Sequence, residues 1–302
     1  MKNCLRLRFF LPLLLLIQGS HLGASGEGPR VHGPAPVGAD ILVFHASSLN
    51  DANRSFDPSL VTPFQKFDTS IGTLQYARTM ELGGRFVLLT GMLRGGKSTR
   101  KTDKPEQNAS SSGLADPSIG VSINLKGIPP LSLEEFREYR PGTVVNLFLA
   151  ATLPLGEYDS RNRVNLGSNR WAFRVGVPIV HPLEWVPGKL ATLEFVPNLY
   201  FFTENPDKKL KQNPLLTIEG YVTQNFTSNF WGAFGFLYNY GGKTDIRGIQ
   251  QNGTQKSLSL TFALNYEFSP RWAMGFRFGE TVAQNEFGLD GTLYHLKLIS
   301  RF

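Results

Sequence analysis

Four residues in the first third of the chain have the spacing of a phosphate-binding loop. Gly91, Gly96, Lys97 and Ser98 match the pattern glycine, four residues, glycine, lysine, serine, in which backbone N–H groups and the lysine surround the phosphates of a nucleotide. That mechanism needs a helix that begins at the lysine and points its N-terminus at the phosphates. Residues 99–105 are polar and offer no apolar face to pack against a sheet. We therefore expect no nucleotide site here and interpret the match as a turn-rich loop tip.

The sequence offers no catalytic or metal-binding pattern. Beyond residue 25 the histidines are His32, His45, His181 and His295, and none has the spacing of an H-E-x-x-H or similar metal site. A barrel hydrolase would need a serine or aspartate beside a histidine near its external rim, and no such set can be assembled. We therefore predict no catalytic residue, no metal and no cofactor, and expect the protein not to be an enzyme.

Alternating strands carry most of the chain. Between residues 68 and 302 about eleven stretches of roughly ten residues alternate apolar with polar or small residues, as 257–268 does most clearly. This is the length and pattern of strands that cross a bilayer with an apolar outer face and a polar inner face. Short and long connections also alternate, and an even strand count brings both termini to one side. With a first strand near Ala39 to Ala46, we predict an all-β, transmembrane antiparallel up-and-down β-barrel of about twelve strands.

Both ends of the chain agree with this fold. Residues 1–25 carry three cations before the short apolar run 9–17 and then small residues, which is the pattern of a secretory signal peptide. Tyr294, Leu296, Leu298 and Phe302 share one face of the last strand, so an amphipathic strand ends on an aromatic residue. We expect residues 26–302 to form a single barrel in the bacterial outer membrane, exported through a cleaved signal peptide.

Composition excludes several classes of function. The formal net charge of +7 falls to about +4 without the three cations of residues 1–25, which is too small to argue for nucleic acid. The single cysteine, Cys4, lies in the segment expected to be removed. The exported chain would then have no disulfide, thiolate metal site or cysteine nucleophile.

Two connections have distinct chemistry. Ser132 and Glu135 form a capping box, so residues 131–141 are predicted to contain a short helix that covers the barrel rim. The stretch 94–113 is rich in lysine, arginine, serine and asparagine and is nearly devoid of apolar residues. It is predicted to be a mobile, cationic external loop.

Strand parity assigns polar side chains to the lumen. Tyr200, Phe202 and Trp231 also point inward by parity, which would suit an aromatic or otherwise apolar solute. Charges of both signs could equally form a structural network of ion pairs or select a solute, and parity leaves both interpretations open. The predicted pore-lining residues are Arg170, Arg174, Glu194, Asn198, Glu219, Tyr221, Glu267, Arg277, His295, Lys297 and Arg301.

Several motifs between Leu114 and Val177 resemble one known family. These are Ala-Asp-Pro at 115–117, Asn-Leu-Lys-Gly-Ile-Pro-Pro-Leu-Ser-Leu-Glu-Glu-Phe-Arg-Glu-Tyr-Arg at 124–140, Pro-Leu-Gly-Glu-Tyr-Asp at 154–159 and Asn-Leu-Gly-Ser-Asn-Arg-Trp at 165–171. Together with the closing Phe302, the chain resembles the bacterial outer-membrane family labelled putative MetA-pathway of phenol degradation. The resemblance implies a barrel of twelve or a similar number of strands that acts as a transporter, linked by the family's label to aromatic compounds.

These observations predict a function and its partners. We expect an outer-membrane channel or transporter for passive uptake or passage of small, aromatic or hydrophobic molecules. Its expected partners are outer-membrane lipids, the barrel-assembly machinery through the strand that ends in Phe302, and a small-molecule solute, with no nucleic acid and no nucleotide. Two alternatives are a barrel enzyme that acts on a lipid or ester, and a plugged barrel with a structural or surface-interaction role.

Overall fold

A computed structural model describes residues 26–57, 60–140 and 142–302. The predicted signal peptide, residues 1–25, lies outside the described residues. Within the described ranges no helix has the length and hydropathy needed to cross a membrane.

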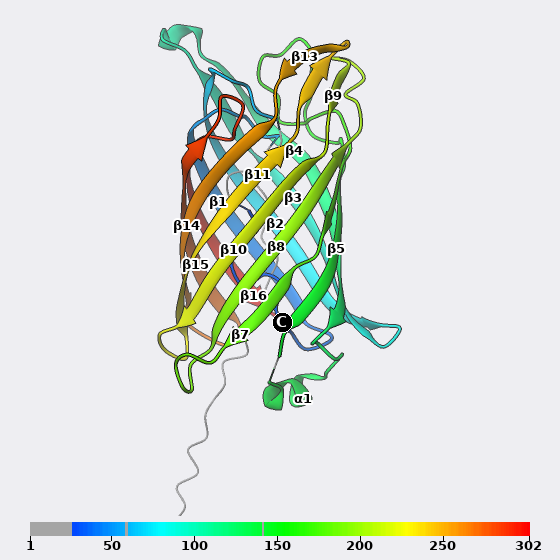
Figure 1. The fold of residues 1–302 in the computed structure, drawn as a ribbon, viewed down its shortest axis with the longest axis vertical. Coiled ribbons are helices and arrows are strands. Elements are labelled where there is room, and N and C mark those ends of the chain that lie inside the picture. The colour runs from blue at the N-terminus through cyan, green and yellow to red at the C-terminus, as the bar shows by residue number, and fades with distance from the viewer. Residues whose placement is uncertain (1–25, 58–59, 141) are drawn as a thin grey trace, which may run out of the picture.

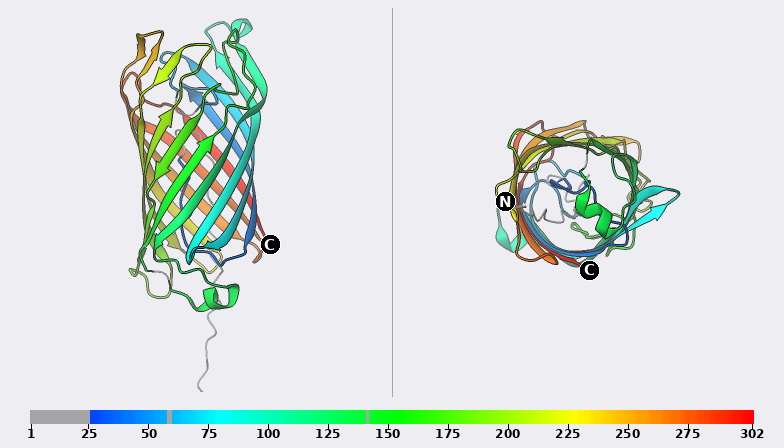
Figure 2. Two further views of the ribbon diagram at one scale, coloured as in Figure 1. Left: turned by 90° about the vertical axis from the view of Figure 1, so that its right-hand side faces the viewer. Right: turned by 90° about the horizontal axis from the view of Figure 1, so that it is seen from below.

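In the described residues, twelve antiparallel strand positions close into one barrel (Figures 1 and 2). The first and last strands pair with each other from Ile41 with Arg301 to Asn50 with Thr292, and this pairing closes the wall. One position is divided: β6 and β7, separated at Val177 and Pro178, both pair with the strands on either side. The strands of the wall are β1 (Asp40–Ala52), β2 (Lys66–Leu82), β3 (Arg85–Lys101), β4 (Ala109–Lys126), β5 (Val144–Thr152), β6 (Ala172–Gly176), β7 (Ile179–Leu183), β8 (Ala191–Phe202), β10 (Leu215–Asn225), β11 (Phe230–Gly241), β14 (Gln255–Glu267), β15 (Trp272–Gln284) and β16 (Thr292–Arg301).

The alternation of each strand sorts its side chains between the two faces of the wall. In β16 the outward residues Tyr294, Leu296 and Leu298 are 41–52% exposed, whereas the intervening His295 is 5% exposed. Phe302 follows the strand and is 67% exposed. In a soluble protein so many large exposed apolar side chains would be unfavourable, but in a bilayer they contact lipid. The predicted fold class is confirmed, and the side chains predicted to face lipid point outward from the last strand.

The two ends of the barrel differ (Figure 1). The turn end carries the tight turns, the C terminus and the helix α1 (Leu133–Glu138). The loop end carries longer connections than these turns and a separate small sheet formed by β9 (Leu210–Gln212), β12 (Thr244–Ile246) and β13 (Ile249–Asn252), although residues 127–143, which contain α1, make a long connection at the turn end. In barrels of this class the short turns face the periplasm and the long loops face outward.

The segment 94–113 is not a loop, which corrects the prediction. The strands β3 and β4 continue through it, paired from Arg94 with Ala115 to Arg100 with Ala109, and only residues 102–108 connect them. This connection includes the 3-10 turn η1 (Pro105–Gln107). The hairpin projects at the loop end, as the small sheet that contains β13 also does (Figure 1). Because its residues are mostly polar or small, its strands lack the apolar alternation of the other wall strands, while the backbone ladder persists.

The helix α1 forms where the capping box predicted it. The Ser132 hydroxyl accepts a hydrogen bond from the Glu135 N–H, and the Glu135 carboxylate accepts one from the Ser132 N–H at 2.9 Å. Phe136 is the buried residue of this short helix. Seen from the turn end, α1 lies beneath the barrel opening (Figure 2), as predicted for a helix at the rim.

The residues of the apparent phosphate-binding motif lie in the middle of β3, with no helix after the lysine. Gly96 is explained by packing, since a Cβ atom at this position would lie 2.0 Å from the backbone oxygen of Ser70 in the neighbouring strand. The glycine lets β2 and β3 approach, so the match to a nucleotide motif is a coincidence of barrel packing.

Candidate functional site: the occupied lumen

The chain that precedes β1 lies inside the barrel. We call residues 26–38 the N-terminal plug; those from 26 to 36 are buried, although they belong to no helix or strand. The plug reaches β1 at the turn end, where the Val37 N–H donates to the Leu131 carbonyl at 2.8 Å beside α1. Its other described end, Gly26, lies within the lumen against the wall.

Glu27 connects the plug to β6. Its carboxylate forms an ion pair with Arg174 and also contacts the imidazole of His32, and all three side chains are nearly inaccessible to solvent. The Arg174 Nε donates to Asn198 at 2.8 Å, and its guanidinium lies 4.5 Å from the ring centroid of Phe148. Since a buried charge is costly without a partner, the plug and the wall satisfy each other's charges.

Two further carboxylates of the wall bind the backbone of the plug. Glu219 accepts hydrogen bonds from the N–H groups of Glu27 at 2.7 Å and Gly28 at 3.3 Å. Glu194 accepts the Arg30 N–H at 2.9 Å. On the opposite side the Arg277 Nη1 donates to the Gly26 carbonyl at 3.3 Å. The wall therefore supplies the acceptors and the donor that an irregular segment needs when it is buried.

Arg30 and His32 fix the plug by their side chains and backbone. The Arg30 guanidinium lies 4.5 Å from the ring centroid of Trp231 and donates from Nε to Thr223 at 2.9 Å. The carbonyl of His32 accepts from Asn146 at 2.8 Å, and its ring meets Phe148 edge to face. These contacts involve several strands, so the plug is held by more than one part of the wall.

A second segment enters the lumen from the loop end. In the connection between β1 and β2, Arg54 and Phe56 are 0% and 5% exposed, and Asp57 forms an ion pair with Arg170 at 2.7 Å. Burial lowers the pKa of Arg54 to about 9 against the opposing charge of Asp290, so the guanidinium remains cationic at neutral pH. The lumen is thus narrowed from both ends.

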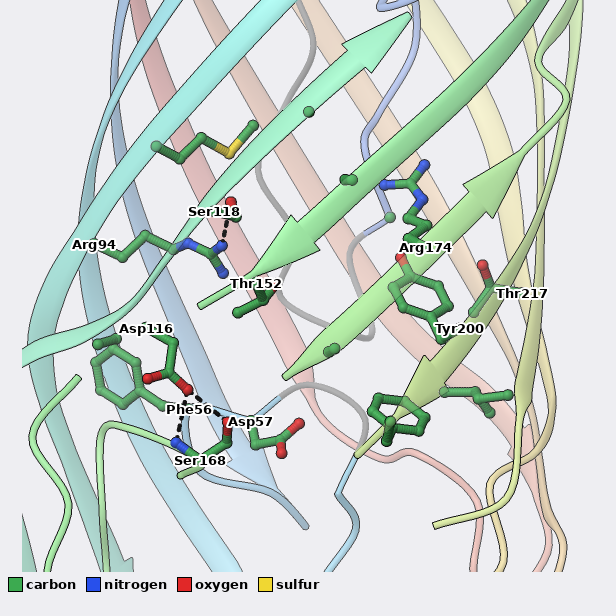
Figure 3. A pocket seen from close by; sticks show the side chains of 18 of the residues that line it. Phe56, Asp57, Arg94, Asp116, Ser118, Thr152, Ser168, Arg174, Tyr200 and Thr217 are labelled. Atoms are coloured by element: carbon green, nitrogen blue, oxygen red, sulfur yellow. Dashed lines mark hydrogen bonds between the residues drawn. The ribbon is translucent and has the colours of Figure 1, made fainter. Parts of the chain in front are cut away.

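A cavity remains between the plug and this connection (Figure 3). The cavity is partly open to solvent, and the space in it that can hold the centre of a water molecule amounts to about 100 Å³. Gly26 of the plug lines one side and Phe56 and Asp57 line another, while the wall is contributed by strands from β2 to β11. Apolar and aromatic side chains dominate its surface, with Arg94 and Arg174 as its cations.

The predicted pore-lining residues all lie on the inner face, and most serve the occupants of the lumen. Arg174, Glu194, Glu219 and Arg277 contact the plug directly. Asn198 and Tyr221 support them, by accepting from Arg174 and donating to Glu219, and Arg170 binds Asp57. That these residues line an open pore stays a prediction. The inner-face residues are Arg170, Arg174, Glu194, Asn198, Glu219, Tyr221, Glu267, Arg277, His295, Lys297 and Arg301.

Three of the remaining candidates, Glu267, His295 and Arg301, contact other residues of the wall. Arg301 and Glu267 form an ion pair at 3.3 Å near the turn end. His295 lies 3.2 Å from a nitrogen of His45 and 3.1 Å from the Ser47 hydroxyl. Of the two interpretations of the inward charges, the ion-pair network is the one that these contacts support.

No set of three or more histidine, cysteine, aspartate or glutamate side chains in the described residues could hold a metal ion. The plug and the inward connection were not foreseeable from the residue pattern. Residues 26–38 are rich in glycine and proline and have no period, so they look like a linker. The sequence feature that could have indicated a buried plug is the presence of Glu27, Arg30 and His32 just before a barrel whose predicted inner face carries charges of both signs.

A closed antiparallel barrel with an apolar outer face and a polar, occupied lumen defines a protein of the outer-membrane β-barrel class. The chain belongs to the family described as "Putative MetA-pathway of phenol degradation", whose model matches residues 49–295. No curated protein matches the chain in sequence.

Solved structures share the fold at low identity. An outer membrane channel from Pseudomonas putida F1 is 18% identical, with 91% of this chain and 99% of that chain covered and a TM-score of 0.75. The KdgM porin is 11% identical, with coverages of 87% and 99% and a TM-score of 0.44. The transport unit of the autotransporter AIDA-I from Escherichia coli is 9% identical, with coverages of 87% and 89% and a TM-score of 0.48.

Proposed function

We propose that the protein is a passive outer-membrane channel for small molecules whose conducting route passes through the cavity. The observation that carries the proposal is an unfilled, largely apolar cavity inside a closed barrel, between two segments that are not part of the wall. The plug and the connection between β1 and β2 belong to no barrel strand. Their displacement would therefore leave the backbone ladder of the wall intact.

The lining of the cavity favours small hydrophobic or aromatic solutes. Phe148, Tyr200 and Phe202 contribute aromatic surface, and aliphatic residues such as Ile71 and Leu237 complete it. An apolar lining with a few placed polar groups is typical of a site that takes small organic molecules. A general diffusion pore would instead have a wide aqueous lumen. The description of the family and the similarity to an outer membrane channel of Pseudomonas putida agree with a transport role.

The proposal is for a protein without catalytic activity in the bacterial outer membrane. We infer export through a cleaved signal peptide from residues 1–25, and insertion by the barrel-assembly machinery from the amphipathic last strand and Phe302. Cell fractionation checks the location. Mass spectrometry of the purified protein checks that its N terminus begins near residue 26.

Solute flux into liposomes tests the channel function. Purified full-length protein is reconstituted, and liposome swelling is measured for uncharged solutes of increasing size alongside single-channel conductance. Small solutes should enter and the rate should fall steeply with size. The matched control is the same protein with a cross-linked plug, for which cysteines are introduced in the plug and in the facing wall, since Cys4 is the only cysteine of the chain. A bilayer that stays sealed to every solute, with or without reduction of the cross-link, would contradict the proposal.

A further inference from the structure

Arg94 is a cation of the cavity that has no ion-pair partner among the described residues. It projects from β3 beside Ser118, to whose hydroxyl its Nη2 donates at 2.6 Å (Figure 3). Its Nε has no hydrogen-bond partner among the described residues, and no carboxylate of those residues lies within ion-pair distance of it. A guanidinium has five N–H donors, so most of the donors of Arg94 have no acceptor in the described part of the protein.

The carboxylates around the cavity are already engaged by other groups. Asp116 accepts hydrogen bonds from the N–H of Gly156 at 2.8 Å and from the N–H and hydroxyl of Ser168 at 2.7 and 2.6 Å. Its charge attracts Arg94 from a distance, but both of its oxygens bind the connection between β5 and β6. Asp57 binds Arg170, and the plug occupies Glu219. The described residues therefore supply no anion that is directed at Arg94.

Arg174, the other cation of the cavity, provides the contrast. It has Glu27 as an ion-pair partner and Asn198 as an acceptor, and it lies over the rings of Phe148 and Tyr200. The two arginines face the same cavity. Arg174 is paired with the plug, whereas Arg94 lines the cavity and has no carboxylate partner among the described residues.

The surface opposite the charge is aromatic and aliphatic. Phe148, Tyr200 and Phe202 line the cavity together with Met92, which lies two residues before Arg94 on β3. An anion bound here would contact a guanidinium at one end and rings at the other. The planar guanidinium of arginine can bind both oxygens of a carboxylate, which the compact ammonium of lysine does less well. The single positive charge of Arg94 fits a ligand with one negative charge.

We propose that the cavity is a binding site for a small aromatic monocarboxylate, with Arg94 as the residue that recognises the carboxylate. The ring of the ligand lies against the aromatic wall, and Ser118 holds the guanidinium in place. This inference deepens the proposed function, because it names the class of solute for the same cavity. Binding itself, however, does not require passage through the barrel.

Equilibrium binding to the purified full-length protein in detergent tests the inference, with benzoate, benzyl alcohol and acetate as probes in calorimetric titrations. Benzoate should bind saturably and more tightly than either benzyl alcohol, which lacks the charge, or acetate, which lacks the ring. Arg94→Gln should weaken benzoate binding by about tenfold or more, because a hydrogen-bonded charge is lost, and should change benzyl alcohol binding by less than about twofold.

Two further variants separate recognition from loss of fold. Lys97→Gln removes an exposed cation from the same strand and should leave benzoate binding unchanged. Ser118→Ala keeps the charge of Arg94 but removes the oxygen that positions it, and should weaken benzoate binding by a factor smaller than Arg94→Gln does. Equal benzoate affinity in wild type and Arg94→Gln, or acetate binding as tight as that of benzoate, would overturn the inference.

Failure of this inference and failure of the channel function give different results. If the channel function fails, liposomes stay sealed while benzoate still binds in an Arg94-dependent way. If the inference fails, neutral solutes still cross the bilayer and benzoate affinity does not depend on Arg94.

Discussion

The lumen has two regions, the plugged region and the cavity. Inward-facing side chains of the wall strands line both, but only the plugged region is filled by the chain. In the plugged region, Glu27, Arg30 and His32 meet Arg174, Glu194 and Glu219, and nearly every charge has a partner. In the cavity next to it, the surface is mostly apolar and Arg94 has donors without acceptors among the described residues. Residues of the chain itself fill the plugged region, whereas the cavity stays unfilled.

This difference distinguishes the region that holds the plug from the region that can bind a solute. A segment whose buried charges are all paired is stable only in one position, because displacement exposes or orphans several charges together. In the cavity, by contrast, Arg94 has donors without acceptors among the described residues. A ligand that accepts hydrogen bonds from these donors would be stabilised by them. The plugged region is therefore suited to close the barrel, and the cavity is suited to receive a solute. The change that should alter this comparison most is loss of the plug itself.

Removal of residues 26–31 should open the plugged region, so that neither region of the lumen is filled by this part of the chain. The deletion takes away Glu27 and Arg30, so Arg174, Glu194 and Glu219 would face water in a widened lumen. Single-channel conductance in planar bilayers should rise severalfold, since the constriction widens while the strand ladder of the wall is untouched. Circular dichroism should still report a β-barrel.

The control for the deletion shortens a segment that does not occupy the lumen. Removal of residues 103–107, at the tip of the hairpin between β3 and β4, should leave conductance near the wild-type value. If the deletion of 26–31 leaves conductance unchanged, the plug does not limit the route and the two regions do not differ in function.

Arg174→Gln should loosen the plug without removing it. The substitution leaves the buried carboxylate of Glu27 without its arginine, and loss of one member of a buried ion pair costs about 3–5 kcal/mol. Hydrogen exchange of residues 26–38, followed by mass spectrometry, should become faster, while exchange of the barrel strands should not. Conductance should show more frequent open events.

A double variant and an exposed ion pair test whether the effect belongs to the buried pair. Glu27→Gln combined with Arg174→Gln should cost less than the sum of the two single changes, because neither side chain then remains charged and unpaired. Arg161→Gln breaks the exposed pair with Asp159 at the loop end and should leave the plug unchanged. Strict additivity of the two single changes would show that the pair does not hold the plug.

Phe148→Ala should remove the ring that separates the cavity from the plugged region. The ring of Phe148 lines the cavity and also contacts His32 of the plug and Arg174 of the wall, so it lies where the regions meet. Its loss should cost about 3 kcal/mol, the lower end of the range for a buried phenylalanine, because water can enter the space from the cavity. A lower unfolding temperature together with a weaker preference for aromatic over aliphatic solutes is expected.

Leu149→Ala is the matched control for this change. Leu149 is the next residue of β5 and faces outward, so its truncation should not alter solute preference. If both variants change solute preference equally, the effect arises from the strand and not from the ring between the regions.

The sequence predicted the wall far better than its contents. Parity of the strands placed Arg277 and His295 inside and Leu296 and Phe302 outside, because a side-chain period of two is local and every strand repeats it. Residues 94–113 form paired strands and not the predicted loop, because their polar side chains lack the apolar alternation that marks a strand. There the pairing of β3 with β4 is a long-range property of the backbone.

The candidate site was only half visible in the sequence. The inward charges could be identified, but their partners could not, because Glu27 meets Arg174 and Glu219 across long stretches of chain. The cavity is assembled from single residues of many strands, and its character depends on which acceptors are already occupied. The unmatched donors of Arg94 can be recognised only after the hydrogen bonds of Asp116 and Ser118 are known.

Ser132→Ala should have the smallest effect and tests how far the plugged region extends. Loss of the cap should destabilise α1 by about 1 kcal/mol, which is enough to fray a helix of six residues. Leu131 accepts the hydrogen bond of Val37 at the end of the plug, so a frayed α1 should slightly accelerate hydrogen exchange at residues 35–38. Exchange at Glu27 should not change, because its partners lie on β6 and β10.

Glu135→Gln is the control for this change, since glutamine also completes a capping box. It should preserve both α1 and the plug. If Ser132→Ala accelerates exchange over the whole of residues 26–38, α1 and the plug open as one unit and closure begins at the turn end. If exchange changes only within α1, the charged contacts of the lumen are sufficient to hold the plug, and the plugged region ends where those contacts end.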